Sequence, residues 1–336
     1  MNGKKERLAR LLYRSGLEKV LRRTAGSRLI VFNYHRIRPD DAGATSWFDD
    51  GVFGPTVSEF AQQVGWLARH ARILSEGALL QAARTGSRTQ GLSAMITFDD
   101  GYRDNYTLAF PVLKRLGIPA IFFVPTRPVT ERRLGWWDVI AYLIKRMAKP
   151  QFQWEGQRLP LGNGQRREAI RHVQRAMKLE PQERTADLLT RLSAACEVAL
   201  PDQRIQDGEL MTWDQVRDVS EHGIAIGSHT HTHRVLATLD PASQEEELRV
   251  SKEILERETG RAITSLAYPV GGYQHFTRET QAIAARCGYE LGFSFNTFIN
   301  HWETLAPFDV RRVEGPRAFS LLVGAAVLPG VFARWN

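Results

Sequence analysis

Short apolar runs rich in β-branched and aromatic residues alternate along this chain with segments of helical periodicity. Strands that are separated by helices usually join a parallel sheet, because the chain has to cross back before the next strand can begin. A (β/α) barrel fits the number of these runs better than an open doubly wound sheet, which is the alternative. Seven runs are predicted to be strands, at residues 28–34, 93–98, 120–125, 224–228, 263–268, 289–295 and 309–313.

The intervening helical segments have recognisable ends. One begins at Pro241, directly after the predicted N-cap residue Asp240, and stops at Gly260. Another stops at Gly117. These signals define helices that connect the strands, and they support an α/β fold class.

Residues 127–211 interrupt the alternation and are too many for a loop. Charged sequence of helical character dominates this segment, so we predict a helical insertion. Trp136 and Trp137 either stack on a sugar ring or anchor the insertion to its own core. Paired tryptophans within a helical pattern favour the anchor.

The two ends of the chain differ in character from the predicted barrel, residues 28–315. Residues 1–27 are rich in Lys and Arg, and their loosely amphipathic pattern predicts a basic helix, either at a membrane surface or packed on the domain. Residues 316–336 include the longest uncharged run, Ala318–Ala333, which is shorter than the roughly 20 residues of a membrane-spanning helix. We interpret it as an apolar packing or membrane-surface element.

The composition of the chain limits which partners and which cellular compartment are expected. The chain has 336 residues and a formal net charge of +8, but its basic residues are dispersed, so we expect no nucleic-acid partner. Peripheral contact with a membrane stays open. Cys196 and Cys287 are too few for a disulfide framework and are not spaced as a metal motif. No secretory signal is evident, so a cytoplasmic or membrane-peripheral location is expected.

Polar residues gather where four of the predicted strands end. In a parallel barrel all of these ends face one side, which is where sites on such folds are assembled. The residues at those ends are Tyr34 and His35, Asp99 and Asp100, His229, His231 and His233, and Pro269 and Val270.

The histidines and the paired aspartates are ambiguous when they are taken separately. A continuing strand would put His229, His231 and His233 on one face, whereas a helix would bring together only His229 and His233. Asp99 and Asp100 precede a glycine, and the sequence Asp-Asp-Gly directly after a strand is also common in turns. Together, two imidazoles and one carboxylate form an open ligand set for zinc or another first-row divalent metal. Because a second carboxylate can accept a proton from water, the groups predict a metal-assisted hydrolase.

Three stretches resemble motifs of the polysaccharide deacetylases, which are carbohydrate esterase family 4 and carry the NodB-homology domain. The stretches are TFDDGY, SHTHTH and AYPVGG, and the resemblance covers residues 28–315 with 127–211 outside the shared core. It implies a distorted (β/α)7 barrel. It also implies hydrolytic removal of acetyl groups from an N-acetylated polysaccharide or glycan, such as chitin, peptidoglycan or poly-N-acetylglucosamine, with release of acetate.

The same resemblance implies roles for individual residues. Asp99 is expected to be the catalytic base. Asp100, His229 and His233 are expected to bind one divalent metal, with His231 lying between ligands without being one. Zinc is the expected metal, and cobalt, manganese, iron and nickel are alternatives.

One departure from the family pattern concerns the residue that orients the base. Ala267 and Tyr268 precede Pro269, where the family usually has an arginine. We predict that Arg312, rather than Arg311, takes over this role.

A second departure concerns the general acid. The family's late Leu-x-His motif is not found after residue 315. His35 is predicted to replace it, because the Asn-Tyr-His segment resembles the opening of family members with a circularly permuted motif order, and imidazole ordinarily titrates near neutral pH. Tyr34, Tyr102, Pro269 and Val270 are predicted to contact the substrate or its oxyanion.

Three other functions fit parts of the sequence. A small-molecule amidase acting on a linear C–N bond would use the same ligands in a closed pocket. A catalytically silent carbohydrate-binding module would keep the aromatic residues without hydrolysis. A nucleic-acid or membrane-surface protein would use the positive charge but would leave Asp99, Asp100, His229 and His233 without a role.

Overall fold

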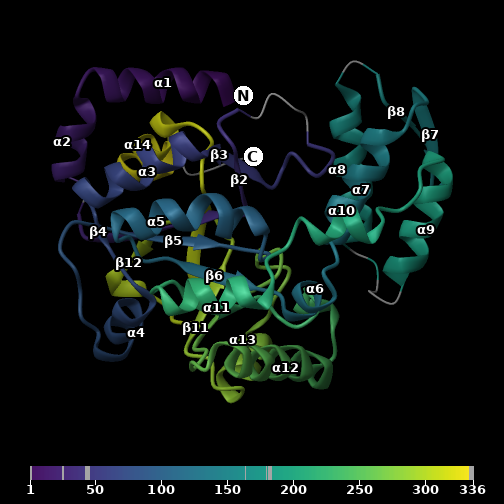
Figure 1. Ribbon diagram of the computed structural model, residues 1–336. Coiled ribbons are helices and arrows are strands. Elements are labelled where there is room, and N and C mark those ends of the chain that lie inside the picture. Colours follow the sequence, from purple (N-terminus) through teal and green to yellow (C-terminus); the bar gives the residue numbers. More distant parts are fainter. Residues whose placement is uncertain are drawn as a thin grey trace.

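Seven parallel strands close into a barrel in the order β1, β13, β11, β10, β9, β6, β5 and back to β1 (Figure 1). Because β1 pairs with both β5 and β13, the sheet has no gap, and the open doubly wound alternative is wrong. Each strand lies within a residue or two of its predicted bounds, so the predicted (β/α)7 barrel is confirmed. The strands are β1 (Arg28–Tyr34), β5 (Leu92–Phe98), β6 (Ile121–Val124), β9 (Ala225–Ser228), β10 (Ser265–Ala267), β11 (Leu291–Ser294) and β13 (Val310–Glu314).

The computed structural model describes residues 2–24, 26–41, 46–162, 164–178, 180 and 184–332. Parts of the predicted N-terminal helix (1 and 25), insertion (163, 179 and 181–183) and C-terminal element (333–336) lie outside the described residues.

Alternation of side chains along the strands separates two apolar layers. Ile30 and Phe32 of β1 point outward and pack with the surrounding helices, whereas Leu29 and Val31 point into the barrel. The same period of two operates on every strand. It therefore decides which residues just beyond the strand ends can reach the mouth of the barrel.

Shorter strands extend the barrel or lie beside it. β12 pairs with β1 in antiparallel fashion, and β4 pairs in parallel with β5. Two further pairs form small separate sheets. These strands are β2 (Arg36–Arg38) with β3 (Phe53–Thr56), β4 (Arg72–Ile73), β7 (Gln151–Trp154) with β8 (Gln157–Pro160), and β12 (Asn300–His301).

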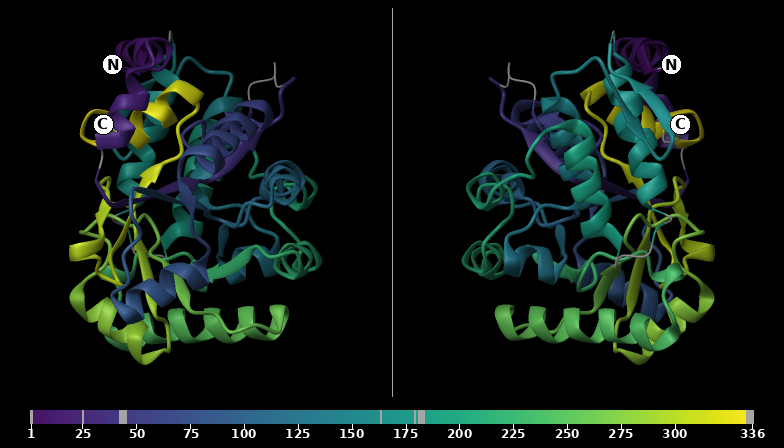
Figure 2. Two further views of the ribbon diagram at one scale, coloured as in Figure 1. Left: turned by 90° about the vertical axis from the view of Figure 1, so that its left-hand side faces the viewer. Right: turned by 90° about the vertical axis from the view of Figure 1, so that its right-hand side faces the viewer.

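Helices cover the outside of the barrel (Figure 2). As the sequence predicts, the Asp240 side chain caps α12 by accepting a hydrogen bond from Ser243 N at 3.0 Å, and Gly260 ends it with a φ of 66°. Gly117 likewise ends α5 with a φ of 64°. The helical elements are α3 (Val57–His70), α4 (Glu76–Thr85), η1 (Asn105–Ala109), α5 (Phe110–Leu116), α11 (Trp213–Glu221), η3 (Leu236–Thr238), α12 (Pro241–Thr259), α13 (Arg278–Arg286) and η4 (Trp302–Thr304).

Between β6 and α11 the chain leaves the barrel and packs a second apolar core, which includes Ile140, Leu143, Val173 and Leu192 (Figure 1, right). The β7–β8 hairpin belongs to this region, so it is not wholly helical. Its helices are α6 (Thr126–Glu131), α7 (Trp136–Arg146), α8 (Gln165–Met177), α9 (Thr185–Cys196) and α10 (Gln203–Asp207).

The two ends of the chain pack on each other, at the end of the molecule opposite α12 (Figure 2). Apolar α14 (Phe319–Val327) is almost wholly buried beneath α1 (Asn2–Arg14) and α3, so it is a packing element. α2 (Leu17–Thr24) also contacts α14, and the short α15 (Pro329–Phe332) follows it. Among the described residues, no helix is both long enough and apolar enough to cross a bilayer.

Candidate active site

A cavity of about 880 Å³, which includes space open to solvent, lies between the carboxyl ends of the barrel strands and the insertion. Strand-end residues form one wall, and residues of α7, α8 and the loop before β3 form the other. The lining residues are His35, Asp49, Val52, Asp99, Asp100, Trp136, Trp137, Gln174, Lys178, His229, His233, Tyr268, Val270, Phe295 and Arg312.

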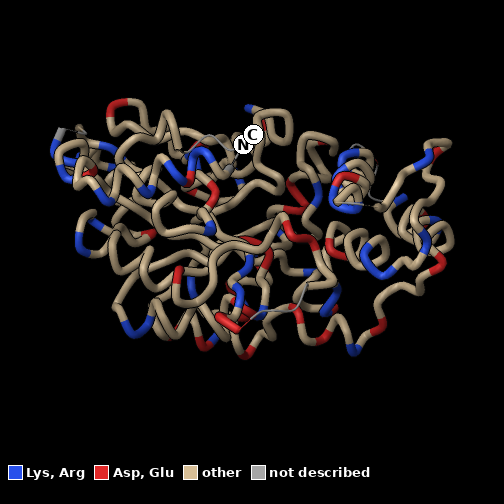
Figure 3. Tube along the Cα trace, turned by 90° about the horizontal axis from the view of Figure 1, so that it is seen from above, with Lys and Arg blue, Asp and Glu red and all other residues tan. Residues whose placement is uncertain are grey.

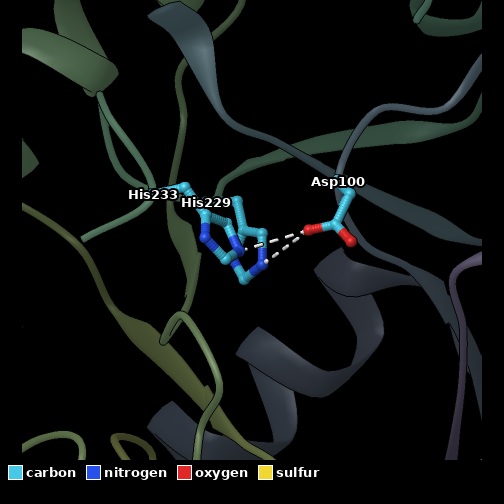
Figure 4. Close-up of side chains that lie close together, drawn as sticks. All are labelled: Asp100, His229 and His233. Atoms are coloured by element: carbon cyan, nitrogen blue, oxygen red, sulfur yellow. Dashed lines mark ion pairs between the residues drawn. The ribbon is translucent and has the colours of Figure 1, made fainter. Parts of the chain in front are cut away.

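Asp100, His229 and His233 line this cavity, and their side chains point toward one another (Figure 4). Asp100 Oδ1 lies 3.4 Å from His229 Nε2 and 3.3 Å from His233 Nε2, and one donor atom from each residue lies within 4.8 Å of the others. The third histidine of the motif, His231, lies outside the cluster, with Nδ1 2.8 Å from Thr126 Oγ1. The predicted set of three ligands is therefore the set that the fold brings together.

Neighbouring groups orient both imidazole rings. His229 Nδ1 lies 2.8 Å from the Ala267 carbonyl oxygen, which can only accept, so Nδ1 carries a proton and Nε2 is the ring nitrogen that faces Asp100. His233 is fixed by its backbone N–H, which donates to Thr230 Oγ1 at 3.0 Å, and its ring centroid lies 4.6 Å from that of Trp137.

The charges of the cluster suit a divalent cation. Burial acts to raise the pKa of Asp100, but its interactions with His229 and His233 outweigh burial and hold that pKa well below its ordinary value. Burial also lowers the pKa of His233, which favours the neutral, ligating form. One carboxylate and two imidazoles, all three nearly excluded from solvent, form an open ligand set of the kind that zinc and similar ions take.

Asp99 is held by partners from two other strands. Arg312 Nη1 donates to its Oδ1 at 2.7 Å, and Asn33 Nδ2 donates to its Oδ2 at 3.0 Å. Arg312 Nη1 also donates to Asn33 Oδ1 at 2.8 Å, which closes a triangle of buried side chains. Burial acts to raise the pKa of Asp99, but Arg312 and His229 outweigh it, so the net pKa is lowered and the carboxylate is ionised.

Strand alternation explains why Arg312, and not Arg311, reaches Asp99. Val310 belongs to the interior of the barrel, so Arg312, two residues later, points inward and is 1% exposed. Its Nε donates to the carbonyl of Ser294 at 3.1 Å. Arg311 points outward, where its Nε lies 3.4 Å from Asp309 Oδ2.

His35 lies at the mouth of the barrel beside the aspartates. Its Nε2 is 4.0 Å from Asp99 Oδ2, which is too long for a hydrogen bond, and its side chain is partly open to the cavity. It continues the inward alternation of Val31 and Asn33 on β1.

Several residues at this site have strained backbone conformations. Four of the seven described non-glycine residues with positive φ are Asp100 (71°), Thr230 (64°), His233 (62°) and Val270 (61°). Such conformations persist only where the surrounding structure enforces them, and they are frequent at functional sites. Val270 lines the cavity, whereas Pro269 is not among the lining residues.

Tyr34 and Tyr102 occupy different positions from those the sequence predicts. Tyr34 has the outward phase of β1, and its hydroxyl donates to Gln63 Oε1 at 2.7 Å in the outer core. Tyr102 is buried behind the cavity wall, where its hydroxyl donates to Asp138 Oδ2 at 2.7 Å and accepts from Trp137 Nε1. Neither side chain lines the cavity, so the prediction that they contact substrate does not fit their positions.

Asn33 and the wall formed by the insertion belong to the site but are not predicted by the motifs of the sequence. The signal for Asn33 was a polar residue inside an apolar strand, two positions before His35. Trp136 packs against the core of the insertion, and both Trp136 and Trp137 line the cavity. Gln174 Nε2 from α8 donates to Asp49 Oδ2 at 2.8 Å across the same wall.

The closed seven-stranded barrel carries an Asp–His–His cluster and a second carboxylate at its mouth, which are the groups of a metal-assisted hydrolase. Residues 86–155 and 180–292, more than half of the chain, match the model of the polysaccharide deacetylase family, and the chain belongs to that family. The match omits residues 156–179, which lie in the insertion.

Named relatives agree with this assignment. The chain is 25% identical over 198 residues to the putative polysaccharide deacetylase YxkH of Bacillus subtilis, covering 59% of this chain and 43% of that protein. It therefore spans less than half the length of that relative. Two solved structures share the fold with a TM-score of 0.55 each. The deacetylase PplD of Streptococcus pyogenes in complex with acetate is 18% identical (86% of this chain, 92% of that chain), and IcaB from Ammonifex degensii is 21% identical (90% and 97%).

Proposed function

We propose that the protein is a metal-dependent hydrolase that removes N-acetyl groups from a sugar polymer or glycan and releases acetate. The observation that carries the proposal is that Asp99 and the cluster of Asp100, His229 and His233 face one cavity at the mouth of the barrel. Membership of the polysaccharide deacetylase family supports the class of substrate. Nothing in the relatives favours the small-molecule amidase.

Asp100, His229 and His233 would hold one divalent cation, with zinc the expected ion. A divalent cation in this position supplies Lewis acidity toward a carbonyl oxygen and increases the acidity of water. The chain's own residues then have to move the protons and hold the substrate.

Asp99 is the proposed base. Its lowered pKa keeps the carboxylate ionised, so it can accept a proton from the attacking water. Arg312 and Asn33 each occupy one of its oxygens, and they fix the direction of the carboxylate. This positioning replaces the arginine that the family usually carries before Pro269.

His35 is the proposed acid. Its imidazole faces the cavity near Asp99, and it would protonate the amine nitrogen as the C–N bond breaks. The backbone N–H of Val270 is proposed to donate to the oxyanion, because the positive φ of Val270 turns the chain at the cavity wall.

Trp136 and Trp137 are proposed to contact the sugar. Both line the cavity opposite the barrel, and the indole N–H of Trp137 is engaged by Tyr102, which leaves its ring as the contact surface. Aromatic rings suit the apolar faces of sugar rings.

Acetate release from a panel of N-acetylated oligosaccharides tests the proposal. The metal-loaded protein should release acetate and leave a free amino sugar, whereas the Asp100→Ala protein should release none. Small linear amides should be poor substrates. Release from linear amides but from no oligosaccharide would assign the site to an amidase instead.

A further inference from the structure

Two neighbouring helices, α1 and α2, present apolar side chains on their outer face. Leu8 is 50% exposed, Leu11 65% and Leu17 50%. Val20 is also exposed and lies three residues after Leu17, on the same side of α2. In most of the described surface, large exposed apolar residues occur singly, so their concentration on two adjoining helices is unusual.

The helical period separates this outer face from the face that holds the helices on the barrel. In α1, Ala9 and Leu12 are buried, and Tyr13 packs edge-on against Phe319 of α14 with ring centroids 5.1 Å apart. Leu8 and Leu11 lie three residues apart on another side of the same helix. The inner face therefore provides the packing that keeps α1 folded, and the leucines are not needed for it.

Positive charge accompanies the exposed leucines. Residues 2–24 contain eight Lys or Arg and two Glu, a formal charge of +6 out of +8 for the whole chain. Figure 3 looks down on this end of the molecule and shows Lys and Arg along its left-hand part, where α1 and α2 lie.

The two glutamates do not offset this charge on the outer face. Glu18 is buried, with Oε2 3.8 Å from Arg22 Nε, and Glu6 pairs with Arg10. By helical period, Glu6 lies on the opposite side of α1 from Leu11. Leucines flanked by basic residues, with the acidic groups turned away, form a surface that complements anionic lipid headgroups over an apolar layer.

We propose that the outer face of α1 and α2, defined by Leu8, Leu11, Leu17, Val20 and the adjoining basic residues, docks on an anionic lipid bilayer. The helices lie parallel to the surface, with the leucines in the boundary between headgroups and acyl chains and the Lys and Arg side chains among the headgroups. A second copy of the chain is a poor occupant, because two faces of the same positive charge would oppose each other.

Vesicle sedimentation tests this docking on the full chain. We expect the protein to pellet with vesicles of phosphatidylcholine containing roughly one-third phosphatidylglycerol, and to stay in solution with pure phosphatidylcholine. The protein with Leu8→Ser and Leu11→Ser should bind at least about tenfold more weakly, because both side chains leave the apolar layer. Raised salt should also weaken binding, since it screens the headgroup charge.

The chain offers a matched control in Leu116 and Leu200, which are 42% and 43% exposed outside α1 and α2. Leu116→Ser with Leu200→Ser should leave vesicle binding unchanged. All variants should keep wild-type acetate release from soluble oligosaccharides, which separates docking from the proposed chemistry. Equal binding to neutral and anionic vesicles, or full binding by the Leu8/Leu11 variant, would overturn the proposal. The proposal would also be overturned if the protein formed a dimer in solution and the Leu8→Ser and Leu11→Ser substitutions abolished that dimer.

Discussion

Asp99 and Asp100 are neighbours in the chain, yet their carboxylates have different partners. Asp99 continues the inward phase of β5 and meets Arg312 and Asn33. Asp100 has a φ of 71°, so the chain reverses there and its carboxylate faces the two histidines. The left-handed conformation of Asp100 thus separates the proposed proton acceptor, Asp99, from a proposed metal ligand, Asp100.

Replacing Asp99 with Asn should separate chemistry from metal binding. The amide keeps the shape of the carboxylate but cannot accept a proton, so we expect kcat to fall by about a hundredfold or more. Metal content should stay at the wild-type level, because the cluster does not include Asp99. Near-wild-type turnover in Asp99→Asn would mean that another group is the base.

Asn33→Ala tests whether the base needs positioning. The substitution removes the amide that holds Asp99 Oδ2 and the oxygen that accepts from Arg312 and Thr97. We expect kcat to fall by about tenfold with little change in KM, since a misdirected carboxylate slows proton transfer without weakening substrate binding.

Asn300 provides the control for this experiment. It is also buried and hydrogen-bonded, but to the backbone N–H and carbonyl of Arg311, and these bonds do not involve the side chains of Asp99 or Arg312. An equal loss of kcat in Asn300→Ala and Asn33→Ala would mean that the effect is general destabilisation, and the positioning role would be withdrawn.

His35→Ala should keep the fold and the metal but lose most deacetylation, with the loss in kcat. The exposed His301 serves as the comparison, because His301→Ala removes an imidazole far from the cavity lining. Activity that survives in folded, metal-loaded His35→Ala would place the acid elsewhere or leave the proton to solvent.

At the scale of elements, a buried charged cluster joins the insertion to the barrel. Asp138 of α7 accepts from the hydroxyl of Tyr102 and from the backbone N–H of Asp49 at 3.0 Å. The Arg36 guanidinium lies 4.5 Å from the centre of the Tyr102 ring. Burial raises the pKa of Asp138 to about 7, although Arg36 opposes that rise.

This raised pKa predicts a pH-dependent stability. A carboxyl whose pKa is higher in the folded state binds more protons there than in the unfolded chain. The Asp138 carboxyl therefore stabilises the folded state fully at pH values below its ordinary pKa of about 4. This stabilisation is lost as the pH rises through about 7. Between pH 5 and 8, the melting temperature of Asp138→Asn should therefore rise relative to wild type, by on the order of 5 °C.

Asp218→Asn is the matched control for that measurement. Asp218 also accepts from a tyrosine hydroxyl, that of Tyr106 at 2.8 Å, but it is open to solvent. Its substitution should leave the pH profile parallel to wild type. A parallel profile for Asp138→Asn as well would mean that Asp138 does not titrate in this range.

The sequence predicts the elements better than it predicts the direction of single side chains. All seven barrel strands could be identified, because their apolar runs and the intervening helix caps are local signals. These strands are buried on both faces, so the run gives no clue to which alternate residues point inward. The sequence therefore predicts Tyr34 at the site, whereas the structure places Asn33, one residue earlier, beside Asp99.

Contacts between segments that are far apart in the chain also could not be predicted from the sequence. The pattern around Trp136 and Trp137 predicts burial, but only the packing of the insertion against the barrel brings them to the cavity. By contrast, the three proposed ligands could be predicted from the sequence. Sites on such barrels form at the carboxyl ends of the strands, and few residues there have side chains that bind metals.

At the scale of the whole molecule, metal binding should stabilise the fold. A ligand that binds only the folded state adds about 2.7 kcal/mol when its free concentration is about 100 times its dissociation constant. A chelator should therefore lower the melting temperature of wild type, and zinc should restore it. His229→Ala and His233→Ala should show no response to either.

His231→Ala is the control, because its ring lies beside Thr126 outside the cluster. It should respond to chelator and zinc as wild type does. A full response in His233→Ala together with none in His231→Ala would show that the wrong histidine was assigned to the metal.

The closure of the barrel by β1 has a consequence for synthesis on the ribosome. Arg312 follows Asp99 by 213 residues and Asn33 by 279, so these contacts are among the longest-range in the chain. At bacterial or eukaryotic elongation rates, on the order of ten to forty seconds pass between the emergence of Asp99 and that of Arg312. Until β13 enters beside β1, Asp99 cannot pair with Arg312. We therefore expect nascent chains that lack β13 to be inactive, with catalytic competence arriving in the same step that seals the barrel.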